Sequence, residues 1–555
     1  MKDKRVFSWV YARAKRELPK IAAISVMRIL VTVLGVVFAL TSRYVIDSAV
    51  AGDKLGLWQN SVVLILVIFA QICIKLLGRG IEVNVTAKLN MRIRGHLFGS
   101  ILRRDYSALG AYHTGDLLTR LSNDASLVAS GIISLVPSVL ALLVGLTYAL
   151  YSLMRLDKNF AVIFLAGGIL LLLVISAFRG VMKKLHKKVQ ETEGKVRSYF
   201  QESLGSVLMV KVFGIEETVS KKADELQMDN FKAQMRRRNL SILASSSLGL
   251  VFSLGSLYAL VYSSYRLYMG TITFGTLMAI IQLVNQIQSP FAGLSGVLPQ
   301  YYAILASAER IMEIEDLEEE ILETTPLDPK EDYKRLREIV FSDVSFGYGR
   351  DIVLKNADLS IKKGDFAVIG GISGIGKSTL IKLLLGVIKP KTGEITLKTA
   401  EEDIKAGKHT RPLFSYVPQG NLLLSGTIRD AVSVVRPDAK DSEIMEAAKV
   451  CCAAEFIEKL PDGLDTYIGE KGFGLSEGQI QRLAITRAIL ADAPIILLDE
   501  ATSALDEGTE ERLLSNIKAL KDKTCIIISH KRAAFDICNK HIFIENKKIR
   551  TEDAV

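Results

Sequence analysis

The segment Gly371-Ile-Ser-Gly-Ile-Gly-Lys-Ser378 has the residue types and the spacing needed to hold a chain of phosphate groups. It matches the pattern G-x-x-x-x-G-K-S/T, in which glycines let backbone N–H groups converge on phosphate oxygens. The lysine of such a loop reaches the β- and γ-phosphates, and the serine hydroxyl can bind Mg²⁺. We therefore expect a nucleotide to be held by Gly371, Ser373, Gly374, Gly376, Lys377, Ser378 and Thr379.

Two adjacent acids, Asp499 and Glu500, follow the apolar run Ile495-Ile-Leu-Leu. Asp499 suits the coordination shell of Mg²⁺, and Glu500 suits polarising an attacking water, because phosphoryl transfer depends on positioned charge and an oriented nucleophile. The alternative is that the acids cap a helix beginning near Ala501 and Thr502. That alternative leaves a pair of carboxylates at a strand end without a purpose, so we favour the hydrolytic interpretation.

The elements around the glycine-rich loop are those that phosphate binding requires. Residues 366–370 form a short apolar run typical of a buried strand, and residues 379–385 have the pattern of a helix. A loop between a strand and a helix N-terminus directs N–H groups and a favourable dipole at an anion. We expect an α/β nucleotide-binding domain over residues 337–555, preceded over 309–336 by an acidic linker that carries Pro326 and Pro329.

Between the loop and the acids stands Leu475-Ser-Glu-Gly-Gln479, followed by Ile-Gln-Arg482. This segment resembles the signature of ATP-binding-cassette (ABC) proteins, which is usually Leu-Ser-Gly-Gly-Gln. Further landmarks of that family have counterparts here in the family's order. Tyr348 resembles the aromatic residue that stacks on adenine, and Gln419 in Val-Pro-Gln resembles the glutamine that senses Mg²⁺. Ser503-Ala-Leu-Asp506 resembles the D-loop, and His530 resembles the switch histidine. Residues 466–472 resemble the segment that exporters place against their membrane domain.

The resemblance implies ATP and Mg²⁺ as ligands and composite sites between two subunits. Catalysis is then expected from Glu500, His530 and Gln419, and Mg²⁺ binding from Ser378, Gln419 and Asp499. The signature segment of one subunit closes over the ATP of the other in this family. Contacts to ATP outside the glycine-rich loop are implied for Tyr348, Ser476, Gly478, Gln479 and Asp506.

Glu477 departs from the family pattern, because it replaces the first glycine of the signature. Ser476 and Gly478, which make the key contacts in the family, are retained. Three interpretations stay open. The carboxylate lowers the affinity of closure, or it points away and is harmless, or this subunit pairs with a different one and completes a slower site.

Six stretches are apolar and long enough to cross a hydrocarbon core of about 30 Å, which takes about 20 residues. They span residues 21–44, 58–77, 132–155, 160–178, 240–262 and 274–298. Hydrophobic residues make up 49% of the 555-residue chain, and the mean hydropathy is +0.28, which is high for a soluble protein. The first twenty residues, with Trp9 and Tyr11 among basic residues, favour an amphipathic helix on the membrane surface over a solvated tail.

Basic residues gather in the long links after the second and fourth apolar stretches, as in the run Arg236-Arg237-Arg238. The positive-inside rule places these links and both termini in the cytoplasm. This explains the net charge of +10 without nucleic acid, since the charge flanks apolar spans. The links contain few helix breakers, so we expect helical stalks with their tips near residues 104–113 and 210–217.

Residues 114–124, 210–214 and 270–275 resemble intracellular loops and the sixth-span entry of ABC exporters. The resemblance implies an α-helical membrane domain of six transmembrane helices with long intracellular extensions, over residues 1–308, fused to an α/β P-loop ATPase domain. The expected partners are the lipid bilayer and a second half-transporter, as a homodimer or a heterodimer. The expected location is a bacterial plasma membrane, with the ATPase domain in the cytoplasm.

Polar residues inside the spans have two interpretations each. Arg28 in the first span either snorkels or faces a water-filled cavity. In the sixth span, Gln282, Asn285, Gln286 and Ser289 share one helical face, which either lines a substrate path or hydrogen-bonds between helices. Pro290 is a candidate kink in the same span. The five cysteines have no metal-ligand spacing and are interpreted as buried, reduced thiols.

The function expected from these features is ATP-driven export of a small molecule, lipid or peptide by a dimeric half-transporter. Import through the same fold, and an ATP-gated channel or regulatory subunit, are the alternatives. The regulatory alternative is disfavoured because no catalytic residue is missing. The transported substrate is not determined by these motifs.

Overall fold

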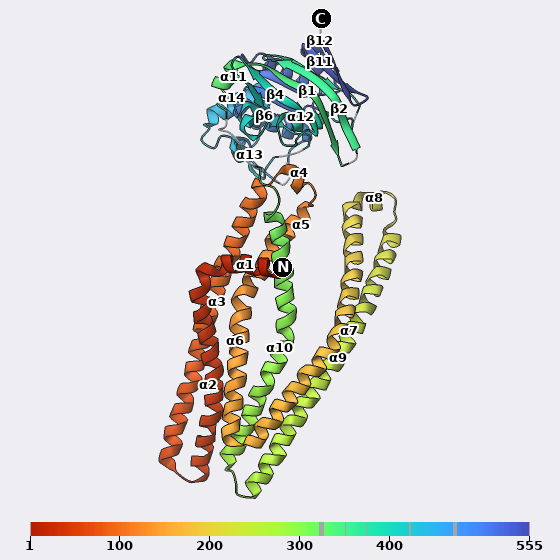
Figure 1. The fold of residues 1–555 in the computed structure, drawn as a ribbon. Helices are drawn as coiled ribbons and strands as arrows, with labels where there is room; N and C mark the ends of the chain where they lie inside the picture. Colours follow the sequence, from red (N-terminus) through yellow and green to blue (C-terminus); the bar gives the residue numbers. More distant parts are fainter. Residues whose placement is uncertain are drawn as a thin grey trace. The chain divides into compact units, whose positions relative to one another are not determined.

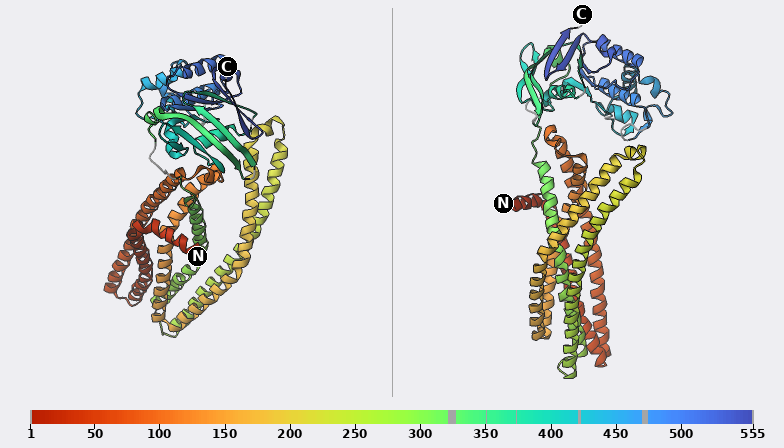
Figure 2. Two further views of the ribbon diagram at one scale, coloured as in Figure 1. Left: turned by 45° about the horizontal axis from the view of Figure 1, so that its top comes forward. Right: turned by 90° about the vertical axis from the view of Figure 1, so that its right-hand side faces the viewer.

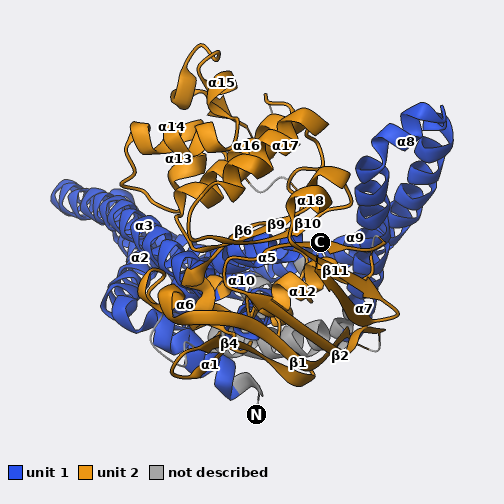
Figure 3. Cartoon of the chain, turned by 90° about the horizontal axis from the view of Figure 1, so that it is seen from above, with its two compact units in different colours: residues 1–100, 114–316 blue, residues 101–113, 317–555 orange. Residues whose placement is uncertain are grey.

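The computed structural model describes residues 2–320, 327–349, 351–372, 374–420, 423–469 and 474–553. Side chains of residues 2–3, 158–179, 183, 248, 289, 291–292, 294–296 and 298 fall outside this description. The chain forms two compact units (Figure 3). Unit 1 comprises residues 1–100 and 114–316, and unit 2 comprises residues 101–113 and 317–555.

Unit 1 is helical, and its long helices contain the six predicted apolar stretches (Figure 1). They are α2 (Leu18–Val50), α3 (Lys54–Arg103), α6 (Ala125–Leu156), α7 (Lys158–Gly205), α9 (Glu216–Tyr268) and α10 (Phe274–Glu315). At 1.5 Å per residue, the 53 residues of α9 extend about 80 Å, more than twice the thickness of a hydrocarbon core. The predicted helical stalks are therefore confirmed.

Shorter elements complete unit 1. Helix α1 (Lys2–Ala14) and the turn η1 (Lys15–Glu17) precede α2, so the predicted N-terminal helix is confirmed. Helix α5 (Thr114–Thr119) and the π-helical turn η2 (Arg120–Asp124) lead into α6. Helix α8 (Val207–Val212) joins the ends of α7 and α9, which run side by side along their length (Figures 1 and 2). This places α8 at the predicted second tip.

Within the described residues, four helical segments are long and apolar enough to cross a membrane. They are Lys4–Val50, Lys54–Arg103, Thr114–Leu156 and Glu216–Tyr268. The predicted fourth span lies on the first part of α7, and the predicted sixth lies on α10, both of which include side chains outside the description. The presence of a membrane-spanning region is supported, and the number six stays a prediction.

Small residues let the helices of unit 1 approach closely. A Cβ atom on Gly145 of α6 would lie 2.4 Å from Cγ2 of Thr32 on α2, and one on Gly131 would lie 2.2 Å from Cδ1 of Ile304 on α10. Small residues at helix contacts are a common packing device in membranes. Pro290 lies within α10 without ending it.

Unit 2 is built on a six-stranded sheet in the order β12-β11-β3-β10-β9-β6. The strands are β3 (Phe366–Gly370), β6 (Phe414–Val417), β9 (Ile495–Asp499), β10 (Thr524–Ile528), β11 (Lys540–Glu545) and β12 (Lys548–Asp553). All neighbours are parallel except β11 and β12. The predicted buried strand 366–370 and the strand ending in Asp499 are both confirmed.

A second sheet is antiparallel, in the order β2-β1-β4-β5. Its strands are β1 (Leu336–Tyr348), β2 (Asp351–Lys362), β4 (Thr392–Thr399) and β5 (Asp403–Lys405). The short strands β7 (Gly426–Thr427) and β8 (Tyr467–Ile468) form a separate pair. The helices of this unit include α12 (Lys377–Leu384), α14 (Asp441–Val450), α16 (Glu477–Leu490), α17 (Glu507–Lys518) and α18 (Arg532–Ile537). Shorter ones are α4 (Tyr106–Leu109), α11 (Glu331–Arg335), α13 (Ile428–Ser433) and α15 (Ala454–Ile457).

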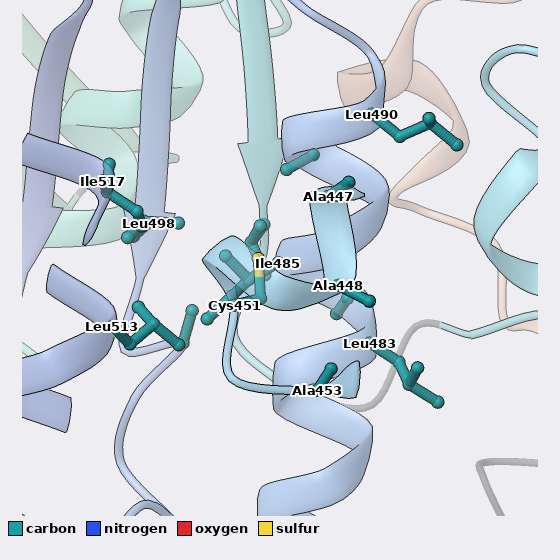
Figure 4. Packing of buried hydrophobic residues seen from close by; sticks show 14 of the residues in the cluster. Ala447, Ala448, Cys451, Ala453, Leu483, Ile485, Leu490, Leu498, Leu513 and Ile517 are labelled. Atoms are coloured by element: carbon teal, nitrogen blue, oxygen red, sulfur yellow. The ribbon is translucent and has the colours of Figure 1, made fainter. Parts of the chain in front are cut away.

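The central strands bury both faces, which is why their sequences are apolar without alternation. Along β9, Ile496 and Leu498 join one hydrophobic cluster with α14, α16 and α17, whereas Ile495 and Leu497 join another with α12 and the antiparallel sheet. Figure 4 shows part of the first cluster, where Leu498 and Ile485 lie near Cys451. This double burial makes the strand ends rigid supports for the loops that follow them.

The loop tip at residues 101–113 belongs to unit 2. Asp105 caps helix α4 by accepting from Ser107 N at 2.8 Å, and its own N–H donates to Glu318 O at 2.9 Å. The Lys382 ammonium of α12 lies 5.6 Å from the Tyr106 ring centroid, a cation–π contact. This tip therefore contacts α12 of the nucleotide-binding domain, as expected for a stalk tip.

Candidate ATP-hydrolysing site

The glycine-rich loop connects β3 to α12 through left-handed backbone conformations. The φ angles of Gly371, Gly374 and Gly376 are +136°, +80° and +113°. At Gly376 a Cβ atom would also lie 2.3 Å from Cγ1 of Val353. Only glycine adopts such geometry without strain. Ser373, which was predicted to contact phosphate, lies outside the described residues.

Lys377 begins α12 and is buried, with 7% of the residue exposed. Its ammonium donates to Gly371 O at 2.7 Å, so the side chain folds back over the loop. It also lies 4.0 Å from Glu500 Oε1. A positive charge in this position is suited to the β- and γ-phosphates of a nucleotide in the loop. Thr379 follows in the first turn of the helix and is buried.

Asp499 lies at the end of β9, where three segments of the chain meet. It is 1% exposed, and it accepts from Ser378 Oγ at 3.1 Å and from the Tyr416 hydroxyl at 3.2 Å. Burial raises the pKa of this carboxyl, and the neighbouring Glu500 raises it further. A bound cation would offset this cost. Carboxylate and hydroxyl oxygens are ligands that Mg²⁺ accepts, so Ser378 and Asp499 fit the predicted metal site.

Glu500 has a φ of +51°, an uncommon conformation for a residue with a Cβ atom. Its N–H donates to Ile528 O at 3.1 Å, and its Oε2 accepts from Gln419 Nε2 at 2.6 Å. Strained backbone of this kind is concentrated at functional sites. The structure thus brings Glu500, Gln419 and Lys377 together from three different segments.

The alternative interpretation of the two acids as helix caps is wrong. In the described residues 501–505 the chain makes turns, and the next helix, α17, begins at Glu507. The N-cap of that helix is Asp506, whose side chain accepts from Thr509 N at 2.9 Å. The hydrogen bonds to Thr509 lower the pKa of Asp506. Asp506 therefore fixes the end of the predicted D-loop.

His530 stands two residues beyond the end of β10 and is exposed. The backbone hydrogen bond from Glu500 N to Ile528 O joins the start of the His530 loop to the end of β9. Tyr348 ends β1 with 51% of the residue exposed, and its ring meets that of Phe346 edge-on at 5.0 Å. An exposed ring of this kind is available to stack on a base.

The predicted signature segment begins α16. Ser476 is the N-cap, and it exchanges two hydrogen bonds with Gln479 in a capping box. A Cβ atom on Gly478 would lie 3.1 Å from Ala504 O, so this glycine permits close contact with the D-loop. Glu477 is exposed at the first helical position, where a negative charge is favourable.

Motif analysis missed Tyr416 and Lys531. Tyr416 directly precedes the Val-Pro-Gln segment, and Lys531 directly follows His530. The only sign in the sequence that these two residues belong to the site was their position next to a motif. The partners of the Tyr416 phenol and the Lys531 ammonium depend on the order of the strands, which the motifs do not give. Burial raises the pKa of the Tyr416 phenol, and the charge of Asp499 contributes to the same shift.

In unit 1, Arg28 forms an ion pair with Glu82 at 2.8 Å and donates to Ser138 Oγ. Both interpretations of this arginine, snorkelling and a water-filled cavity, stay predictions. Of the polar face predicted on α10, Gln286 donates to Gly35 O at 2.7 Å, an interhelical hydrogen bond. Asn285 is exposed on the same helix. The Ser289 side chain lies outside the described part of the chain.

The five cysteines are free, and Cys451, Cys525 and Cys538 are buried. Burial raises the pKa of the Cys451 thiol to about 12, and that of Cys538 likewise to about 12. Thiols with a raised pKa are poor nucleophiles. The interpretation as buried, free thiols is confirmed for these three and is wrong in its burial for Cys73 and Cys452, which are half-buried.

Comparison with known proteins agrees with this site. The family model of the ABC transporter transmembrane region matches residues 21–291, and the ABC transporter model matches residues 354–503. A protein named ATP-dependent lipid A-core flippase, from Pectobacterium atrosepticum, is 30% identical over 478 residues, which cover 84% of this chain and 80% of that protein. The chain belongs to the ABC transporter family.

Other relatives extend the comparison. The ATP-dependent lipid A-core flippase of Escherichia coli is 29% identical over 483 residues, which cover 83% of this half-transporter and 79% of the flippase. A structure of a bacterial Atm1-family ABC exporter with ATP bound superposes with a TM-score of 0.80 at 23% identity. It covers 97% of this chain and 95% of the exporter chain, which shows the fold. The chain is thus an ABC half-transporter of the exporter type, with ATPase activity coupled to transport.

Proposed function

We propose that this half-transporter works as a dimer, either of two copies or with a related half, and binds two ATP molecules at composite sites between the ATPase domains. The observation that carries the proposal is the convergence of Lys377, Ser378, Asp499, Glu500 and Gln419 around the glycine-rich loop. Ser476 and Gln479 stand apart from this set, at the exposed start of α16. That separation suits residues that act on the ATP of a partner subunit.

Each residue of the site has a role that follows from its position. Lys377 and the loop N–H groups bind the phosphates, while Tyr348 stacks on adenine. Glu500 orients the attacking water, and the Gln419 amide holds that carboxylate in place at 2.6 Å. His530 contacts the γ-phosphate. Ser378 and Asp499 would hold Mg²⁺, with Gln419 as a further ligand, and the ion would supply positive charge against the phosphate oxygens.

The domain assignment follows from the same proposal. Residues 1–308 form the membrane domain with six spans, residues 309–336 the linker, and residues 337–555 the ATPase domain. The positive charge on the stalks supports a location of the ATPase domain in the cytoplasm of a bacterial cell. ATP binding brings the two ATPase domains together, and hydrolysis separates them, which is a two-state switch.

For the substrate we propose an amphiphilic lipid. The relatives named above are lipid flippases, and the chain shares more than four-fifths of its length with them. In this chain the Arg28–Glu82 pair is linked to Ser138 across three helices, α2, α3 and α6, which places charge and hydroxyl groups within an otherwise apolar bundle. A headgroup with both charges finds complementary partners there, while acyl chains find apolar surface.

The test is ATP hydrolysis by the purified chain in lipid nanodiscs, with Glu500→Gln as the variant. We expect Mg²⁺-dependent turnover in a particle of dimer mass. Glu500→Gln should lower turnover by about a thousandfold and leave ATP binding intact, because only the orientation of water is lost. Rapid hydrolysis by the variant would refute the role of Glu500. An inactive monomer that still binds ATP would indicate that the working dimer contains a related half-transporter rather than two copies of this chain.

A further inference from the structure

Lys531 lies between two functional loops, immediately after His530. Its ammonium donates to Thr502 O at 2.8 Å and to Leu505 O at 2.7 Å, and it pairs with Glu510 Oε2 at 3.1 Å. The two carbonyls flank the Ser503-Ala504 turn of the D-loop. One side chain therefore fixes both ends of that turn to the loop that carries His530.

Glu510 explains why the ammonium stays in this place. Glu510 is 0% exposed, and its other oxygen accepts from Thr502 Oγ1 at 2.7 Å. A buried carboxylate needs a paired cation, and removing one partner of such a pair is costly. The Lys531 ammonium donates hydrogen bonds to the two carbonyls and forms an ion pair with Glu510 Oε2, which accepts no hydrogen bond from a described residue. The position of the D-loop relative to His530 is thus set by two hydrogen bonds and a buried ion pair.

The D-loop is also held from its other side by the signature helix. Gln481 of α16 donates to Ser503 Oγ at 2.9 Å and accepts from Ala504 N at 3.0 Å. The backbone of Gly478 packs against Ala504 O, at a distance that leaves no room for a Cβ atom without a shift. A displacement at Lys531 is therefore passed through residues 502–505 to the start of α16.

We propose that Lys531 is a positioning residue that couples the γ-phosphate sensor of one ATP site to the surface that serves the other site. The inference rests on the composite sites proposed above, in which His530 acts on the subunit's own ATP while Ser476 and the D-loop act on the partner's. The Lys531 ammonium is directed at the D-loop carbonyls and Glu510. It transmits the position of the His530 loop to the D-loop and the signature helix of the same subunit.

The competing explanation is that Lys531 only stabilises the fold. Lys523 provides a matched control, because its ammonium also has several acceptors, donating to Asp492 Oδ1 at 2.9 Å and to Ala493 O at 3.1 Å. It directly precedes β10, and its acceptors lie in the turn before β9. Both Lys523→Met and Lys531→Met should lower thermal stability, Lys531→Met more because Glu510 is buried and Asp492 is exposed, but only Lys531→Met should change catalysis.

The experiment compares Lys531→Met, Lys531→Arg, Gln481→Leu and the double variant Lys531→Met with Gln481→Leu, using the dimer in nanodiscs. We expect Lys531→Met to lower kcat for ATP about tenfold, since small misplacements near chemistry have effects of this size or more. The KM for ATP should change less than about twofold, because the phosphate loop is intact. Lys531→Arg should restore most of kcat.

Gln481→Leu should lower kcat about tenfold, as Lys531→Met does. The double variant should also lower kcat about tenfold rather than a hundredfold, since both residues act on one unit.

The outcomes separate the two explanations. Three results would each overturn the inference. The first is a kcat of Lys531→Met equal to that of the wild type, and the second is an equal loss of kcat in Lys523→Met. The third is a loss of kcat in the double variant that equals the product of the two single losses. If Lys531→Met fails to fold, Glu510→Gln serves in its place, because the amide keeps the bond from Thr502 and removes only the charge. A wild-type dimer that binds ATP without hydrolysing it would instead refute the proposed composite sites, so the two failures are distinguishable.

Discussion

At the scale of single residues, the ATP site is organised by hydrogen bonds among side chains that belong to different motifs. Gln419 reaches Glu500, Ser378 reaches Asp499, and Tyr416 holds the second oxygen of the same carboxylate. Each acid is therefore oriented by a neighbour before substrate arrives. Preorganised groups of this kind stabilise a transition state without moving at the moment of reaction.

Tyr416→Phe tests the orientation of Asp499. The variant removes the hydrogen bond to Asp499 Oδ2 and keeps the ring. A hydrogen bond of this type contributes about 1 kcal/mol, so we expect the Mg²⁺ concentration for half-maximal ATP hydrolysis to rise about fivefold. Tyr467→Phe, at an exposed tyrosine, is the control. An unchanged Mg²⁺ requirement would show that the hydroxyl does not support the metal site.

Gly478→Ala and Glu477→Gly compare a retained position of the signature with the position whose role the sequence left open. Gly478→Ala forces a Cβ atom against Ala504 O, and we expect kcat to fall at least about tenfold as the D-loop shifts. Glu477→Gly alters an exposed position, and kcat should stay within about twofold. A large gain in kcat for Glu477→Gly would instead support the interpretation that the carboxylate opposes closure.

At the scale of elements, the long helices of unit 1 are held together by close contacts and by polar groups that satisfy each other. Asp124, the last residue of η2 and the N-cap of α6, joins this end of α6 to α10; it is 3% exposed and accepts from Arg310 Nε at 2.8 Å. The same pairing raises the pKa of Arg310, with Asp124 as its main cause. Charge pairing thus holds this end of the helices, whereas small residues hold the apolar part.

Gly145→Leu tests the contact between α2 and α6. Any Cβ atom at this position would overlap Thr32, so we expect the two helices to separate and the melting temperature in detergent to fall by several degrees. Gly249→Leu on α9 is the matched control, because nothing lies within 4 Å of its Cβ position. Equal melting temperatures for the two variants would show that α2 and α6 do not depend on close packing.

At the scale of the whole molecule, exposed apolar side chains gather where α8 joins α7 to α9. At and beside α8, the exposed fractions of Leu208, Val212 and Phe213 are 74%, 72% and 71%. Large apolar side chains clustered at a loop tip mark an interaction surface. The family resemblance of residues 210–214 to a coupling region suggests the ATPase domain of a partner as the occupant.

Phe213→Asp is expected to uncouple transport from hydrolysis. A carboxylate at this tip would be buried without a partner in the dimer, so ATP-dependent lipid movement in vesicles should fall at least about tenfold. ATP binding should persist, because Phe213 lies far along the chain from the ATP motifs. Glu217→Gln, a polar change near the same tip, is the control. Transport at the wild-type rate would exclude this tip from coupling.

Much of this organisation could be predicted from local sequence. The glycine-rich loop, its strand and its helix are consecutive, so their spacing alone predicts a phosphate site. Apolar runs and flanking basic residues likewise predict spans and stalks, because the bilayer imposes length and charge rules on each segment separately.

Contacts between distant segments were decided by tertiary structure. Strand β9 lies between β10 and β6, and this order carries Asp499 to Ser378 and Tyr416 and carries Glu500 to Gln419. The pairing of Arg28 with Glu82 depends in the same way on which helix packs beside α2. Local patterns encode burial and periodicity but not neighbour order, so the partners of Tyr416, Lys531 and Arg28 emerged only when the sheet and the bundle were assembled.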